Sequence, residues 1–353
     1  MIVVKRIKYK HEDDLFKIPG VHAVGIGESG IVVLITPDMR ANRSQIPSTL
    51  DGIPVIVQET EMLSPLSHET TVYRPLPIGA SISSSGKPPG DFGSVGPHVS
   101  RDISDVGACC FLYSLTNTHV LGPFDVNITI NSIYQPGGST TTYGWFGFRF
   151  LPSVCYNGRS FCVFNGPVND TRLKPDAGAI GHPFNDLIPM NSPCNGSQKP
   201  VRRMQYGVGS FVDGPIGIVR IATSCSNCLK NWGVMSHGTQ GGLAGNMTEV
   251  TDIINDGPNR YLKFAPVNLA NVFARGGDSG GLIAWNQTKD VVGLVYAGVP
   301  TGGTPVGYMR LDYVKTAFFN AGVSFDHYWG TNIVTNRPSN SQTDPLFPFP
   351  CST

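Results

Sequence analysis

Short apolar runs separated by glycine, proline, asparagine and aspartate restrict the fold of this chain more than any other feature. From Gly107 to about Val306 they recur at the spacing of a β-sandwich or barrel. The runs with the strongest signal are residues 108–115, 126–130, 145–150, 216–222, 290–296 and 306–309. The 42 glycines and 28 prolines among 353 residues also favour turn-rich β-structure. We therefore expect residues 105–325 to form a mostly β domain.

Both ends of the chain differ from this region. Residues 1–63, called the leader below, are predicted to form a small α+β domain with strands at 21–27, 30–35 and 53–59 and a polar, helix-compatible stretch at 40–50. The leader groups no histidines, cysteines or carboxylates, so we expect an accessory role. Residues 64–104 are rich in Gly, Pro and Ser and predict a linker, with an exposed loop at 83–90. Near the end, a helix at about 312–320 precedes an extended tail, residues 326–353.

Composition excludes several classes of partner. The formal net charge is +1 and charged residues make up 14% of the chain, so no basic field predicts nucleic-acid binding. No apolar run approaches the length of a membrane span. The first seven residues are too short and too quickly charged for a secretory signal. We therefore expect a cytoplasmic or non-classically exported protein.

The eight cysteines leave their chemistry open. Cys225 and Cys228 form a Cys-x-x-Cys pair, and the adjacent cysteines at 109–110 could complete a zinc site. A second matching pair is missing, which weakens that interpretation. Disulfides, for example Cys155 with Cys162, and free thiols are the alternatives. We expect no metal and no cofactor.

A glycine-rich stretch around one Asp-Ser pair, residues 276–281, is the strongest candidate for chemistry. A serine hydroxyl becomes a nucleophile when a base removes its proton, and the resulting oxyanion then needs hydrogen-bond donors. A Gly-Asp-Ser-Gly turn can expose the hydroxyl of Ser279 and aim the N–H groups of Gly277 and Ser279 at one point. The same pattern also fits a hairpin without catalytic function. Whether a suitable base exists elsewhere in the chain decides between the two interpretations.

His119 is the candidate base among eight histidines, because it follows a buried-looking strand and precedes another apolar step that would fix its ring. An orienting carboxylate is expected between His119 and Ser279 if the chain order is His-Asp-Ser. Asp176 fits best, since small residues flank it and lead into an apolar one. Asp170 is the alternative acid.

Three segments resemble motifs of the trypsin/chymotrypsin-like serine peptidase family: residues 277–281 (Gly-Asp-Ser-Gly-Gly), 116–120 (Thr-Asn-Thr-His-Val) and 176–180 (Asp-Ala-Gly-Ala-Ile). The resemblance is to bacterial members with an N-terminal leader domain, whose histidine motif reads Ser-Asn-Asn-His-Val. Residues 234–242, 19–27 and 50–55 are similar to further segments of such proteins. The resemblance extends to about residue 325, although only the serine motif is specific by itself.

The resemblance implies a chymotrypsin-like fold of two antiparallel β-barrels with the active site at their junction. It implies Ser279 as the nucleophile, His119 as the general base and Asp176 as the acid that orients it, with an oxyanion hole from the N–H groups of Gly277 and Ser279. The substrate would be a polypeptide, cleaved through an acyl-enzyme.

Two departures bear on specificity and on the histidine turn. Phe273 stands six residues before the serine, at the family's primary specificity position, which predicts a non-tryptic preference. The pocket strand would contain Tyr296, Ala297 and Gly298. Thr118 replaces the alanine or asparagine that relatives have before the histidine, so the turn there can differ.

Two classes of function follow from the sequence. The first is a serine endopeptidase whose leader modulates access to Ser279 or assists folding, with cleavage in the 83–90 loop relieving a restraint. The second is a catalytically silent structural or binding protein on the same scaffold, in which the leader or the tail mediates association between copies of the chain.

Overall fold

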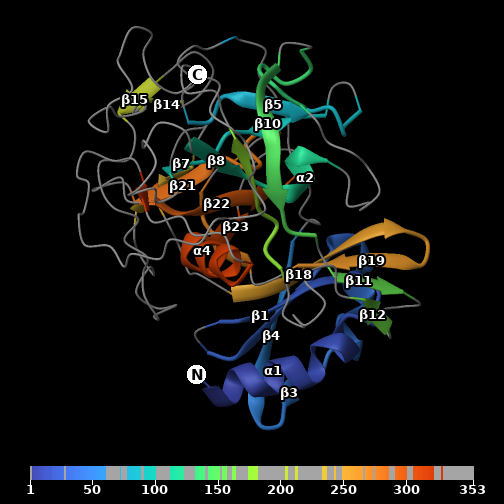
Figure 1. The fold of residues 1–353 in the computed structure, drawn as a ribbon. Coiled ribbons are helices and arrows are strands. Elements are labelled where there is room, and N and C mark those ends of the chain that lie inside the picture. The colour runs from blue at the N-terminus through green and yellow to red at the C-terminus, as the bar shows by residue number, and fades with distance from the viewer. Residues whose placement is uncertain are drawn as a thin grey trace, which may run out of the picture.

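The chain is mostly β, as predicted from its sequence (Figure 1). The computed structural model describes residues 2–27, 29–60, 72, 78–88, 91–100, 112–122, 132–139, 142–151, 153–156, 161–163, 174–181, 203–205, 211–213, 233–236, 242–243, 249–264, 267–272, 274, 276–285, 291–299, 305–321 and 327–328. The strands within these ranges form two large sheets and one small pair, β14 (Arg203–Gln205) with β15 (Phe211–Asp213).

The first sheet has eight strands, all paired antiparallel. In spatial order they are β24 (His327–Tyr328), β7 (His98–Ser100), β8 (Leu112–Thr116), β13 (Gly178–Gly181), β10 (Thr142–Arg149), β9 (Ser132–Tyr134), β5 (Ser81–Ser84) and β6 (Gly93–Ser94).

The second sheet has fourteen strands. Its main path is β17 (Gly242–Leu243), β16 (Gly233–Ser236), β21 (Leu282–Trp285), β22 (Val291–Ala297), β23 (Val306–Arg310), β20 (Val267–Ala270), β18 (Glu249–Gly257), β1 (Val21–Ile26), β2 (Ile31–Ile35), β4 (Ile53–Glu59) and β3 (Thr49–Leu50). A branch leaves β18 through β19 (Arg260–Lys263) to β11 (Ser153–Tyr156) and β12 (Phe161–Val163).

Most of the predicted elements of the large domain are present. Strands β8, β10, β22 and β23 confirm four of the predicted runs, while the runs at 126–130 and 216–222 lie outside the described residues. The predicted helix is α4 (Leu311–Asn320), which buries Val314 and Phe318 against the main core. Of the predicted tail, the structure describes His327 and Tyr328, which pair with β7.

The leader contains one element that the sequence analysis missed and one that it placed differently. Helix α1 (Ile2–Leu15) precedes the predicted strands, and it packs against β1 and β2. The polar stretch predicted at 40–50 is instead a 3₁₀ helix, η1 (Pro37–Gln45), followed by β3. Pro37 begins η1, and its fixed φ suits the first turn of a helix.

The leader is joined to the large domain by the sheet itself, because β1 pairs antiparallel with β18 over residues 23–26 and 249–252. Strand β2 is buried on both faces. Val32 and Leu34 belong to the main core, whereas Ile31, Val33 and Ile35 belong to the leader core with residues of α1. Figure 1 shows α1, β1, β3 and β4 together beside β18 and β19.

Ion pairs, three of whose four side chains are buried or nearly so, add a second connection between the leader and the large domain. Lys263 Nζ of β19 lies 3.1 Å from Glu12 Oε1 and 3.1 Å from Asp13 Oδ1, both on α1. Lys8 Nζ lies 2.9 Å from the other carboxylate oxygen of Glu12. Since unpaired buried charges are costly, these contacts favour one position of α1 against β19.

The linker predicted at 64–104 needs correction. Strands β5, β6 and β7 lie within it, and Ser83 and Ser84, the predicted start of an exposed loop, are 5% and 3% exposed. Buried serines explain the difference, because they satisfy their hydroxyls with main-chain partners. Gly138 N donates to Ser83 Oγ at 3.0 Å, and Ser84 Oγ donates to the carbonyl of Leu121. Such strands show no apolar alternation in the sequence.

Cys155 is disulfide-bonded, and the residue directly opposite it in the β11–β12 pair is Cys162. The cysteines of the alternative zinc site, at 109, 110, 225 and 228, lie outside the described residues. No group of three His, Cys, Asp or Glu side chains among the described residues is placed to hold a metal ion. No helix within that part of the chain is long and apolar enough to cross a bilayer.

The burial of His22 in β1 predicts that the free energy of unfolding depends on pH. Burial lowers the pKa of its imidazole to about 4, against the opposing contact with the carbonyl of Gly20. The unfolded chain therefore binds a proton that the folded chain rejects between about pH 6.5 and 4, and stability falls as the pH falls through this window. The loss at pH 4 is expected to reach about 3 kcal/mol. Urea unfolding at several pH values measures it. His22→Phe should flatten the curve there, and an unchanged slope would contradict the assignment to His22.

Candidate active site

The candidate base, His119, lies on a single helical turn, α2 (Thr118–Leu121), that directly follows β8. Asp176 lies just before β13, the strand that pairs with β8. Its carboxylate holds His119 at two points: Oδ1 accepts from the main-chain N–H of His119 at 3.0 Å, and Oδ2 is hydrogen-bonded to Nδ1 of the ring. Asp176 is 0% exposed and His119 is 5% exposed. The imidazole orientation is thus fixed, with Nδ1 facing the acid.

The two residues before His119 fix the turn to the strand that carries the acid. Asn117 Nδ2 donates to the main-chain carbonyl of Asp176 at 2.7 Å. Thr118 Oγ1 lies 2.6 Å from the carbonyl of Phe150 and 2.8 Å from that of Ala177. The departure from the family motif at Thr118 therefore has a local role, because its hydroxyl bonds the chain around Asp176.

Ser279 lies in the glycine-rich turn before β21, in the second sheet. Gly277 and Gly280 have φ of 100° and 87°, a region that favours glycine. The turn is tied to β22, since Gly280 N donates to Val295 O at 2.8 Å and Val295 N donates to Gly281 O at 2.7 Å. His119 and Asp176 thus lie beside strands of the first sheet, and Ser279 lies beside a strand of the second.

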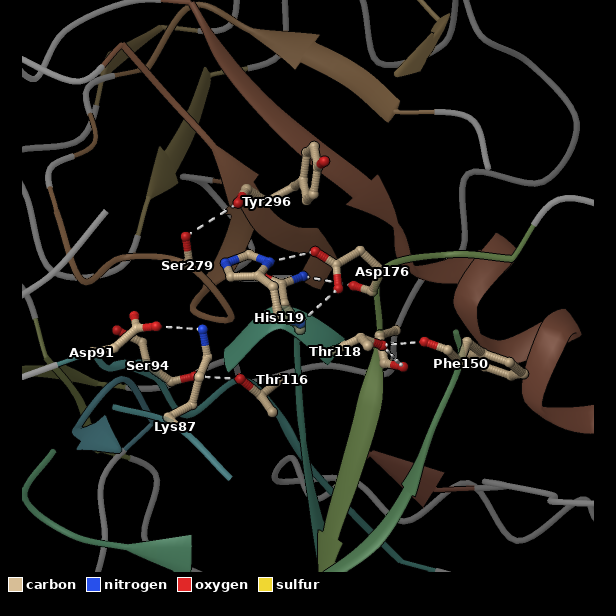
Figure 2. Close-up of polar contacts among 12 residues, drawn as sticks. Lys87, Asp91, Ser94, Thr116, Thr118, His119, Phe150, Asp176, Ser279 and Tyr296 are labelled. Carbon is tan, nitrogen blue, oxygen red and sulfur yellow. Dashed lines mark hydrogen bonds and ion pairs between the residues drawn. The ribbon is translucent and has the colours of Figure 1, made fainter. Parts of the chain in front are cut away.

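The hydroxyl of Ser279 donates to the main-chain carbonyl of Tyr296 at 3.1 Å. The ring atom Nε2 of His119 is buried and has no hydrogen-bond partner among the described residues. Figure 2 shows the imidazole between the side chains of Asp176 and Ser279.

The residues predicted to form the specificity pocket are only partly placed. Phe273 lies outside the described residues. Tyr296 is 0% exposed, and its ring packs edge-on against His119 at a centroid distance of 6.0 Å. It also contacts the ring of Phe264 in a tilted arrangement at 5.7 Å. Ala297 belongs to the main core, and Gly298 is buried. Tyr296 therefore supports the His119 ring, while substrate selection by these residues stays a prediction.

Ser94, which no pattern in the sequence indicated, contacts the serine turn through both its main chain and its side chain. No signal pointed to it, because a single serine within a Gly, Pro and Ser-rich stretch resembles a linker residue.

Gly280 offers a test of how tightly the serine turn is packed. A Cβ there would lie 2.1 Å from Thr116 Oγ1 and 2.5 Å from Ser94 O. Left-handed strain and overpacking together predict that Gly280→Ala lowers the unfolding free energy by roughly 2–5 kcal/mol. Gly138→Ala is the matched control, since its φ is 81° and nothing lies within 4 Å. Thermal unfolding of both variants measures the difference. Equal losses would show that contact with Thr116 and Ser94 contributes nothing.

No family model matches this chain, and no curated protein matches it. Among solved structures it is similar to a chymotrypsin of Cellulomonas bogoriensis, with TM-score 0.32, 14% identity, and coverage of 69% of this chain and 95% of that one. Thermobifida fusca protease A gives 0.34, 14%, 69% and 95%, and Nocardiopsis protease gives 0.35, 14%, 70% and 97%. Similarity at this level carries no argument about activity, which has to be judged from the site itself.

Proposed function

We propose that this chain is a serine endopeptidase that cleaves polypeptides through Ser279, His119 and Asp176. The observation that carries the proposal is the buried, two-point contact between Asp176 and His119. In a Ser-His-Asp site the carboxylate on Nδ1 fixes the tautomer and orientation of the base, and this is the contact that Asp176 makes with His119. The unpartnered Nε2 is the atom that would accept the proton of Ser279.

In the proposed reaction, Ser279 Oγ attacks the scissile carbonyl while His119 Nε2 takes its proton. Asp176 stabilises the imidazolium without becoming protonated. The main-chain N–H groups of Gly277 and Ser279 donate to the oxyanion. His119 then returns the proton to the leaving amine, and a water molecule hydrolyses the acyl-enzyme in the same way.

The non-tryptic preference is part of the proposal. No carboxylate stands at position 273, so a basic substrate side chain would lack a counter-charge. Hydrolysis of a peptide library is expected to disfavour Arg and Lys before the cleaved bond.

A fluorophosphonate probe tests the function directly, because it labels an activated serine covalently. Wild type should be labelled at Ser279, identified by peptide mass mapping, and Ser279→Ala should not be labelled. His119→Ala should lose labelling although Ser279 remains, which separates an activated serine from a merely accessible one.

A specific observation favours the alternative of a silent scaffold protein. Ser279 is 0% exposed, and its hydroxyl is bonded to the carbonyl of Tyr296 instead of His119. If that arrangement persisted with substrates, the serine would stay inert. A folded wild type that is not labelled by the probe alone and that cleaves no peptide of the library would support this alternative.

A further inference from the structure

Ser94 connects the sheet that carries the base to the turn that carries the nucleophile. Its main-chain N–H donates to the carbonyl of Ser279 at 2.7 Å, and its hydroxyl donates to the carbonyl of Gly277. The residue is 3% exposed, so water does not compete for these acceptors.

Ser94 is itself held in place from the first sheet. Its carbonyl accepts from Thr116 Oγ1 at 2.8 Å, and it pairs with Ser81 across β5 and β6. Thr116 ends β8, three residues before His119. Figure 2 shows the hydrogen bond between Thr116 and Ser94, with Ser279 and His119 beside them. The serine turn is therefore positioned relative to His119 through Ser94.

Hydrogen bonds from Ser94 and from Gly281 order the main chain of the turn. Three successive carbonyls accept hydrogen bonds: Gly277 O from the Ser94 hydroxyl, Asp278 O from Gly281 N at 2.9 Å, and Ser279 O from Ser94 N. In a trans peptide the N–H points opposite to the carbonyl. Holding the carbonyl of Asp278 therefore holds the N–H of Ser279 on the opposite side.

Gly277 depends most on such a contact. It has no side chain, and its φ of 100° lies in a region open to glycine, so sterics alone restrict its rotation weakly. A hydrogen bond on its carbonyl holds the peptide plane between Gly277 and Asp278 and so restricts ψ of Gly277. Together with φ, ψ sets the angle between that plane and the preceding peptide, which carries the N–H of Gly277.

We propose that the hydroxyl of Ser94 is a positioning group that holds Gly277 with its N–H aimed at the oxyanion. The inference rests on the proposed peptidase function and deepens it. Ser94 touches neither the substrate nor the reacting atoms, and it acts through the main chain of Gly277.

Ser94→Ala removes the donor and keeps the main-chain contact. Its kcat on a peptide substrate is expected to fall about 10- to 100-fold, less than the loss of a whole oxyanion donor, while KM changes less than about threefold. A peptidyl trifluoromethyl ketone forms an adduct that carries an oxyanion. Its inhibition constant should rise by the same factor by which kcat/KM falls. Ser94→Thr keeps the hydroxyl and should recover most of the rate.

Ser81→Ala is the matched control. Ser81 lies opposite Ser94, is 4% exposed, and accepts a hydrogen bond from Gly137 N at 3.1 Å, away from the serine turn. It should lower the melting temperature without changing kcat. If Ser94→Ala does not fold, Ser94→Cys tests the same donor, because a thiol fills the space but donates weakly.

Wild-type kcat in a folded Ser94→Ala or Ser94→Cys variant would overturn the inference, and so would a kcat loss shared by Ser81→Ala. A rate loss without a matching loss of ketone affinity would also overturn it. A wild type that cleaves no peptide would instead remove the proposed function, and with it the role of Ser94.

Discussion

Replacing Ser279 or His119 by alanine is expected to lower kcat by about 10⁴- to 10⁶-fold, because the members of one catalytic unit act together. The double variant should lose little more than either single one. Purified variants assayed on the best peptide from a library measure this, with circular dichroism to show that each remains folded. Additive losses in the double variant would mean that the two residues do not act as a unit.

Asp176→Asn separates the acid from the rest of the site. It preserves the shape of the side chain but offers its amide to His119, which favours the wrong tautomer, so a loss of about 10⁴-fold is expected. Asp170→Asn is the comparison, since Asp170 was the alternative acid and lies outside the described residues. Near-full activity of Asp176→Asn together with a large loss in Asp170→Asn would assign the acid to Asp170.

The residues with distinctive chemistry could be predicted from the sequence, and the structure brings two of them, His119 and Asp176, into direct contact. His119 and Ser279 stand in short motifs, and Asp176 follows from its small neighbours. Ser94 could not be predicted, because its role comes from position: it contacts main-chain atoms 183 residues away. A hydrogen bond to a carbonyl leaves no requirement in the local sequence that a pattern could detect.

The fold was predictable where burial produces apolar runs, and less so elsewhere. Strands β22 and β23 are rich in buried apolar residues and were found. Strand β5 buries serines, and α1 places Lys8 and Glu12 in a buried position where a pattern of polarity predicts exposure. Glu12 tolerates this burial because it forms an ion pair with Lys263. Lys263 is far from α1 in the sequence, so a local pattern could not predict the pair.

The continuity of the second sheet predicts the outcome of removing the leader. A chain that begins near residue 74 is expected not to fold, because β18 would lose its partner β1, and the main core would lose Val32 and Leu34. Burial of those two side chains alone contributes about 3–6 kcal/mol, comparable to the stability of a whole domain. This expectation favours assistance of folding over a restraint on access to Ser279.

Point variants of β2 test the same idea in the full chain. Leu34 faces the main core and Val33 the leader core, and they are 1% and 0% exposed. If the leader and the large domain unfold as one unit, Leu34→Ala and Val33→Ala should each shift a single transition seen by both tryptophan fluorescence and circular dichroism. Leu34→Ala should cost about 2–5 kcal/mol. Two separate transitions, with Val33→Ala moving only one, would mean that the leader unfolds independently. If a truncated chain also folds and has a higher kcat than the full-length protein, the hypothesis that the leader restricts access to Ser279 would be favoured instead.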